Sequence, residues 1–173
     1  MELPEVEHEN HPLVLPVSVT MSILAVLVAC VTVLGHRAHT EELSREIQAA
    51  SRWTQYQAKS IRQNEAENTS DIVALVASLD KEKGESLKKK YEAKVEHYTS
   101  DKSDVSKEAK DLEAERDRAA HRADRFDGGE NLIEIGLVIC SITLLAKKRF
   151  FWFSGMAVAA VGIAVALTGF LLH

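Results

Sequence analysis

The sequence has few of the residues that interrupt helices. All three prolines fall within the first sixteen positions, and Gly84 is the only glycine between Gly35 and Gly128. Proline and glycine are the residues that most strongly end or bend an α-helix. Their scarcity predicts long helices over most of the chain. The segment 1–13, which has two of the prolines, four glutamates and no lysine or arginine, is predicted to be an acidic disordered tail.

The groupings that carry catalysis or bind metals are also missing. We find no glycine-rich phosphate loop, no nucleophile elbow and no Cys–His arrangement, and both cysteines lie in apolar runs as small packing residues. His8/His11 and His36/His39 have ligand-like spacing, but no cysteine or acidic cluster completes a site. We therefore predict no catalytic residue, no metal, no cofactor and no enzymatic activity.

An excess of positive charge is absent as well. Residues 37–131 hold 18 lysines and arginines against 21 aspartates and glutamates, and the whole chain has a net charge of −5. A protein that binds nucleic acid through its phosphates needs clustered positive charge. The charge balance therefore excludes nucleic acid as an expected partner.

What the chain does have is three apolar runs, at 14–35, 131–146 and 150–172. About 20 apolar residues suffice for a helix to cross a bilayer. We predict three transmembrane helices over these ranges in an all-α, multi-pass membrane protein. The first run is not predicted to be a cleaved signal peptide, because the residues before it are acidic and no small-residue cleavage site follows it.

The second and third runs are separated only by Lys147, Lys148 and Arg149, which permits nothing longer than a tight helical turn. Positive charge in short loops favours the cytoplasmic side. This topology-setting turn therefore predicts a cytoplasmic turn and a periplasmic 36–127 segment. The opposite orientation stays open, because an acidic tail is easily translocated and arginines flank the other side of the predicted membrane helices.

Small residues recur at steps of three and four on each apolar run. They are Ser18, Ser22, Ala25 and Ala29 on the first run, Gly136 and Cys140 on the second, and Gly155, Ala159, Gly162, Ala166 and Gly169 on the third. Such faces let helix backbones approach closely in lipid. They predict a helix-packing seam, either within one chain or between subunits.

The segment 36–127 is charged and helical in pattern. Residues in its second half follow alternating steps of four and three over five heptads: Tyr91, Val95, Tyr98, Lys102, Val105, Ala109, Leu112, Arg116, Ala119, Ala123 and Phe126. With a turn near 80–85, this pattern predicts a long antiparallel coiled-coil hairpin inserted between the first and second membrane helices. Alternatively, each arm pairs with arms of neighbouring subunits. Two helices bury little apolar surface, so lateral association is expected in either case.

The first half of this segment carries its own recurring apolar positions, beginning at Leu43 and Ile47 and continuing to Leu79, with a polar zone at 63–70 that predicts a local break or a polar layer. At the far end of the hairpin, Asp127, Gly128 and Gly129 predict a break before the second membrane helix.

Glu134 is the one acid inside an apolar run. Ionisable groups within a membrane are costly and mark functional sites by default. Because Glu134 lies about one turn into the predicted second helix, it has two interpretations. It either caps the helix start near the headgroups, or it forms an ion or proton site or a polar contact between subunits.

Four segments resemble a bacterial membrane family. They are GHRAHTEEL after the first apolar run, W-x-x-Y-Q-A-K-S-I-R from Trp53, RFD-x-GE from Arg125, and LL-x-KKR-x-FW from Leu144. In this order they resemble the domain-of-unknown-function family 4337 over nearly the whole chain. The resemblance implies a bacterial inner membrane and a three-helix membrane part with an inserted coiled coil. It implies no activity or substrate. Members often have basic residues before the first helix, which this acidic tail lacks.

The best-supported expectation is a non-enzymatic, self-associating inner-membrane protein that serves as a scaffold or platform. Its partners would be the lipid bilayer, further copies of itself and another membrane complex. One alternative is an oligomeric channel or transport-associated subunit with Glu134 near the pore. A further alternative is a sensor or docking subunit that acts through a partner complex.

Overall fold

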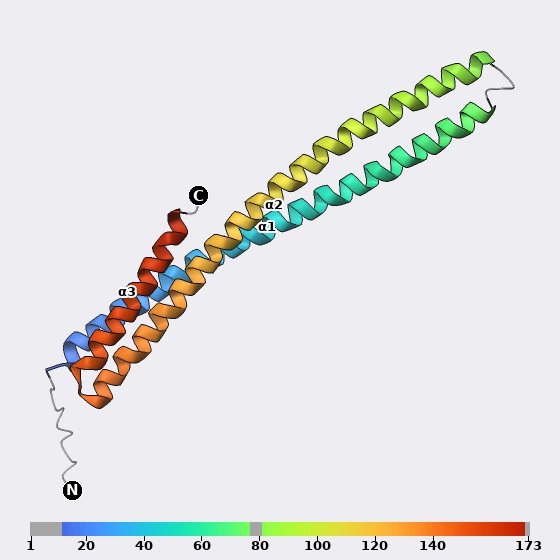
Figure 1. Cartoon of the computed structure of the whole chain (residues 1–173). Helices are drawn as coiled ribbons and strands as arrows, with labels where there is room; N and C mark the ends of the chain where they lie inside the picture. The colour runs from blue at the N-terminus through green and yellow to red at the C-terminus, as the bar shows by residue number, and fades with distance from the viewer. Residues whose placement is uncertain (1–11, 77–80, 172–173) are drawn as a thin grey trace, which may run out of the picture. The chain divides into compact units, whose positions relative to one another are not determined.

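The computed structural model describes residues 12–76 and 81–171, and in these ranges the chain is all-α (Figure 1). It forms three helices: α1 (Val14–Val76), α2 (Lys81–Ala146) and α3 (Arg149–Leu171). Each contains a stretch that is long and apolar enough to cross a membrane. The prediction of an all-α chain with three such helices is therefore confirmed. Most of the predicted acidic tail lies outside the described residues.

α1 begins where its proline is tolerated. Pro16 lies in the first turn, where the missing N–H would have no partner inside the helix. From there α1 continues without interruption through 63–70, so the predicted local break in that zone is wrong. The predicted turn near 80–85 is also misplaced, because Lys81 already belongs to α2 and Gly84 lies inside that helix. Residues 77–80 lie outside the described ranges.

The predicted break at Asp127–Gly129 does not exist. α2 runs through these residues as one helix, so the second apolar run is the end of a 66-residue helix and not a separate one. Glycine weakens a helix by only about 1 kcal/mol relative to alanine, which packing can outweigh. The packing that outweighs it involves Gly129 itself, which lies against α3.

α2 and α3 are joined by a minimal turn. Lys147 has a φ of 52°, in the left-handed region that commonly terminates helices, and its N–H donates to the Thr143 carbonyl at 2.9 Å. α3 then starts at Arg149. Only Lys147 and Lys148 lie between the two helices, so α3 must return antiparallel to the end of α2.

The helices divide into two compact units. Among the described residues, unit 1 contains 12–40 and 118–171, and unit 2 contains 41–76 and 81–117. The core of unit 1 joins all three helices and consists of Leu24, Val31, Ala38, Ala123, Phe126, Ile133, Cys140, Ala159 and Ala166. In Figure 1, α3 lies beside the last part of α2 within this unit.

Unit 2 consists of α1 and α2 side by side in opposite directions (Figure 1). Ion pairs join them. They are Arg45–Glu115 and Arg52–Glu108, each at 3.1 Å, and Lys59–Asp101. As the position on α1 rises by seven, the position on α2 falls by seven, which is the pattern of antiparallel helices in register. We call these three pairs the ionic ladder.

The two helices of unit 2 use their apolar residues differently. All of the heptad positions predicted for the second arm, from Tyr91 to Phe126, are buried or half-buried. On α1, by contrast, the predicted apolar positions such as Leu43, Ile47 and Ile61 are exposed. The buried and half-buried side of α1 in unit 2 mixes small, polar and aromatic residues, among them Ala49, Arg52 and Trp53, with Val73 as its one large aliphatic side chain among the described residues.

Candidate functional site: packing faces and polar groups of the apolar helices

The seam between α2 and α3 is built on two pairs of glycines. A Cβ added at Gly136 would lie 2.7 Å from the Gly155 carbonyl oxygen, and one at Gly155 would lie 2.6 Å from that of Gly136. Gly129 and Gly162 are related in the same reciprocal way. Real Cβ atoms essentially never come so close to a carbonyl oxygen. The two helix backbones therefore touch at both points, and no larger residue fits there.

The remaining small residues of this seam lie between the glycine pairs and beyond them on both sides. Ala159 is against Gly136, Ala166 is against Gly129, and the Cys140 thiol is against Gly155. Gly169 faces the Phe126 ring, which also makes an edge contact with Phe170 at 5.4 Å between ring centroids. All the predicted seam residues of the second and third runs, from Gly136 to Gly169, are buried.

The contacts of this seam begin earlier on α2 than the predicted second apolar run does. Contacts continue from Cys140 opposite Gly155 to Phe126 opposite Gly169. The stretch of α2 that pairs with α3 therefore begins near Phe126 and not at the predicted 131. Gly129 belongs to the seam, although the sequence analysis assigned it to a break.

On α1 the predicted small-residue face lies elsewhere. Ser18, Ser22, Ala25 and Ala29 are all exposed, while the residues that bury α1 in unit 1 include Val17, Leu24 and Val31. A shallow hollow of about 480 Å³ follows this face. Its lining is Ser18, Val19, Ser22, Ile23, Val26 and Leu27. The small-residue face of α1 is thus left uncovered by the described residues of unit 1.

Glu134 occupies a different place from the one predicted. α2 begins at Lys81, so Glu134 cannot cap a helix start. In the seam register it lies level with the middle of α3, and its side chain is exposed. Asn131, three residues before it, and Ser141, seven residues after it, share its face of α2. Polar groups therefore lie on the outer surface of unit 1 at the level where α3 is wholly apolar.

A second acid, Glu130, was missed by the sequence analysis, which placed it one residue outside the predicted helix. Its carboxylate accepts a hydrogen bond of 2.6 Å from the Thr32 hydroxyl, whose single proton has the Val28 carbonyl at 2.9 Å as its other acceptor within reach. Glu130 is half-buried between α1 and α2. The signal that could have found it is a hydroxyl inside the first apolar run, Thr32, together with an acid directly before the second run, Glu130.

One turn further along, His39 and Asp127 form another cross-link between α1 and α2, with 3.0 Å between the ring Nε2 and the carboxylate. Gly35 sits beside them, where an added Cβ would lie 3.0 Å from Asp127. His39 thus pairs with an acid. Among the described residues, no three histidine, cysteine or acidic side chains are grouped as metal ligands.

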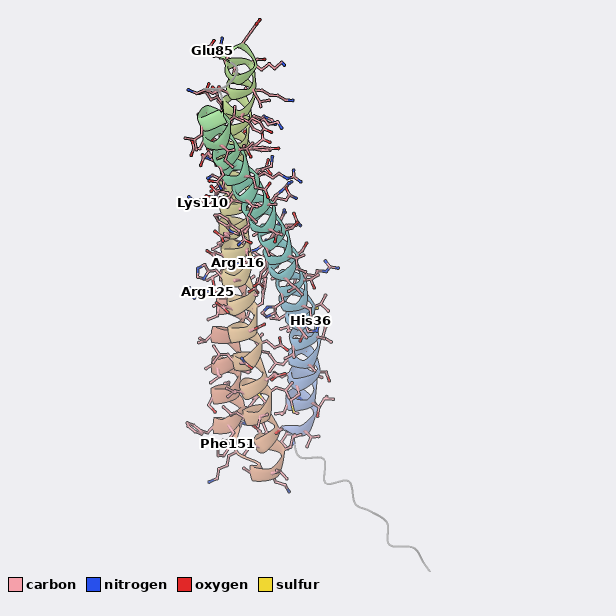
Figure 2. The ribbon with its side chains drawn as sticks, turned by 90° about the vertical axis from the view of Figure 1, so that its right-hand side faces the viewer. His36, Glu85, Lys110, Arg116, Arg125 and Phe151 are labelled. Atoms are coloured by element: carbon pink, nitrogen blue, oxygen red, sulfur yellow. The ribbon has the colours of Figure 1, made fainter. Side chains whose placement is uncertain are left out.

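The predicted topology-setting turn is accessible. Lys147, Lys148 and Arg149 are all exposed, and Phe151 nearby is half-buried (Figure 2). Close to the turn, the Trp152 indole donates to the Thr20 hydroxyl at 3.3 Å, which ties α3 to α1. The fully buried Thr143 hydroxyl has no hydrogen-bond partner among the described residues.

Taken by fold alone, the chain is an all-α protein with three helices that are able to span a membrane. Its sequence matches the family Domain of unknown function (DUF4337) over residues 15–172, and the chain belongs to that family. This confirms the resemblance found from its motifs. No curated protein and no solved structure matches the chain.

Proposed function

We propose that this protein is a non-enzymatic, multi-pass membrane protein that self-associates and presents a charged two-helix hairpin as a scaffold or platform. The observation that carries the proposal is the exposed small-residue face of α1. The matching faces of α2 and α3 are buried against each other inside the chain, whereas Ser18, Ser22, Ala25 and Ala29 are exposed among the described residues. Small-residue faces stabilise helix contacts in lipid, so a further copy of the chain is the partner we propose for this one.

The proposed location is the bacterial inner membrane, with unit 1 in lipid. The dense charge of unit 2, visible around Lys110 in Figure 2, supports a position for that unit outside the bilayer. The basic turn at 147–149 favours a cytoplasmic turn and a periplasmic hairpin. Alkaline-phosphatase fusions within 77–80 test the orientation. An inactive enzyme there, in a fusion protein that accumulates normally, would place the hairpin in the cytoplasm.

Self-association is tested by the mass of the full chain in native nanodiscs, where one discrete oligomer is expected. Ala29→Leu should reduce that oligomer at least tenfold, because it fills the small-residue face. Cys30→Leu is the matched control, since Cys30 is also small and exposed on α1 but points about 100° away from Ala29. A strictly monomeric protein would refute the proposal and favour the sensor or docking alternative.

A second candidate function, an oligomeric channel or transport-associated subunit, is favoured by Glu134. A carboxylate exposed on the lipid-facing side at mid-helix is costly. In an assembly that turned Glu134, Asn131 and Ser141 towards shared water, the cost would be avoided and a polar path would form. Proton or cation flux into liposomes should then fall on Glu134→Gln but not on Asp124→Asn, an exposed acid elsewhere on α2. The absence of any flux from the native protein would refute this candidate.

A further inference from the structure

The connection between α2 and α3 concentrates positive charge. Lys147, Lys148 and Arg149 follow one another in the chain, and all three are exposed. We call these three residues the basic turn. Because α2 ends at Ala146 and α3 already starts at Arg149, their Cα atoms lie within about 8 Å of one another. The fold therefore holds three cations in a small area at one end of unit 1.

Acids are absent from this end of unit 1, as far as its residues are described. The nearest carboxylate along α2 belongs to Glu134, which is 13 residues before Lys147 and therefore about 20 Å away at the helical rise. α3 contains no acid, and α1 contains none before Glu41. Positive charge without acids nearby raises the local concentration of anions. This end of unit 1 is thus suited to an anionic ligand.

Exposed aromatic rings lie beside the cations. Phe150 and Phe153, in the first turns of α3, are 74% and 61% accessible. Trp152 lies between them in the chain, and its indole donates a hydrogen bond to the Thr20 hydroxyl at 3.3 Å. Aromatic rings next to lysine and arginine are typical of the level at which lipid headgroups meet acyl chains. A soluble anion would leave the two phenylalanine rings in water, whereas a phospholipid offers both a phosphate and an acyl chain.

We propose that the basic turn binds an anionic phospholipid, with the phosphate between Lys148 and Arg149 and an acyl chain against Phe150 and Phe153. A guanidinium donates two parallel hydrogen bonds to a phosphate, and a lysine adds a compact charge. α3 has no acid in its first turn, so the positive end of its helix dipole adds to the attraction. The inference rests on the proposed position of unit 1 in lipid, and it does not depend on which side of the membrane the turn faces.

The test uses the fluorescence of Trp152 in the full chain carrying Trp53→Phe, which leaves Trp152 as the only tryptophan. The chain is reconstituted in nanodiscs of phosphatidylcholine, and acyl-brominated phosphatidylglycerol or acyl-brominated phosphatidylcholine is added at increasing mole fraction. Bromine quenches an indole that it contacts. Half-maximal quenching should need at least a tenfold lower mole fraction of phosphatidylglycerol, because each basic residue near the bilayer surface contributes about a fivefold preference for anionic lipid.

Lys148→Gln together with Arg149→Gln should reduce this preference at least fivefold, whereas Lys148→Arg should keep it. Arg37→Gln together with Arg125→Gln is the matched control, because it removes the same charge from two exposed arginines of unit 1. Figure 2 shows Arg125 well away from Phe151, which lies beside the basic turn. A preference that survives the turn substitutions, or falls equally in the control, would overturn the inference.

The same titration separates this inference from the proposed function. Quenching by neither lipid would overturn the position of unit 1 in lipid and the inference with it. Equal quenching by both lipids would leave that position standing and overturn the inference alone. A preference that appears only after Glu2→Gln, Glu5→Gln, Glu7→Gln and Glu9→Gln are combined would assign the basic turn to the acidic segment of the chain, and it would also overturn the inference.

Discussion

The carbonyl oxygens of Gly129 and Gly162 each occupy the space that a methyl group on the other residue would need, at 2.8 Å in both directions. The same reciprocity holds for Gly136 and Gly155. Two such points, seven residues or about two turns apart on each helix, hold α2 and α3 at minimal separation. This spacing also allows weak Cα–H···O contacts between the backbones.

Gly129→Ala should destabilise unit 1, and Gly128→Ala is its matched control. Both substitutions gain up to about 1 kcal/mol of helix propensity. Only the Gly129 methyl meets backbone atoms at 2.8–2.9 Å, whereas the Gly128 methyl has its nearest neighbour at 3.8 Å. We expect Gly129→Ala to cost about 1–3 kcal/mol, as overpacking usually does, and Gly128→Ala to be neutral or stabilising. Unfolding by SDS in mixed micelles measures the stability of both variants. Equal stabilities would contradict the close backbone contact between α2 and α3 at Gly129.

Thr32→Val should weaken the contact between α1 and α2. It keeps the shape of the side chain but removes the hydroxyl that donates to Glu130 at 2.6 Å. A half-buried acceptor that loses its partner costs about 1–3 kcal/mol. Ser22→Ala is the control, because its hydroxyl bonds only to the Ser18 carbonyl of its own helix. The same SDS titration should show the loss for Thr32→Val alone.

Acid should weaken unit 2 through Asp101. The hydrogen bond from Lys59 lowers the pKa of Asp101 below its ordinary value of 3.8, against an opposing effect of burial, and His97 also lowers it. A lowered pKa in the folded state stabilises above the unfolded pKa, and this stabilisation is lost as pH falls through the folded value. Helix content should therefore become more sensitive to denaturant below about pH 4.

Asp101→Asn tests the origin of this pH dependence. The variant should be less stable than the native chain at neutral pH and should show a flatter response to acid. Asp104→Asn, an exposed acid one turn away on the same helix, is the control and should retain the native response. Identical acid profiles for Asp101→Asn and the native chain would assign the effect to other groups.

Trp53→Phe should destabilise unit 2 by about 1–2 kcal/mol, because the indole donates to the Glu113 carboxylate at 2.8 Å and a hydrogen bond to a charged group is stronger than a neutral one. Tyr56→Phe is the control, since it keeps the edge contact with Trp53 and the ring that Lys102 approaches at 5.6 Å. Thermal unfolding followed by circular dichroism compares the two, and equal losses would contradict this role of the indole.

Sequence patterns correctly predicted which face of α2 and which face of α3 are buried. The heptads of α2 lie towards α1, and the Gly155–Gly169 stripe of α3 lies against α2, because in each case the small or apolar residues have a neighbour in the same chain. On α1 composition is a poorer guide. Arg45, Arg52 and Lys59 form ion pairs with acids on α2, whereas Leu43, Ile47 and Ile61 lie roughly on the opposite side of the helix and are exposed.

The candidate site was predicted less well than the fold. The two adjacent glycines at 128 and 129 indicate a bend when only local preference is considered, and nothing in the local sequence reveals the close approach of α3. Setting a boundary there placed Glu130 outside the helix and Glu134 near its start. The role of each acid depends on the α2–α3 register, which only the three-dimensional contacts determine.

The ionic ladder has a consequence for alignment. Its cations and its acids both repeat every seven residues, so sliding one helix past the other by one heptad would preserve two of the three pairs. The positions at which the repeat would continue on α2, however, are Lys94 and Arg122. A slip in one direction would set Lys59 against Lys94, and a slip in the other would set Arg45 against Arg122. Each misaligned state thus replaces one ion pair with a repulsion between two cations. Lys94 and Arg122, which lie outside the ladder, therefore disfavour a shift of the helices by one heptad.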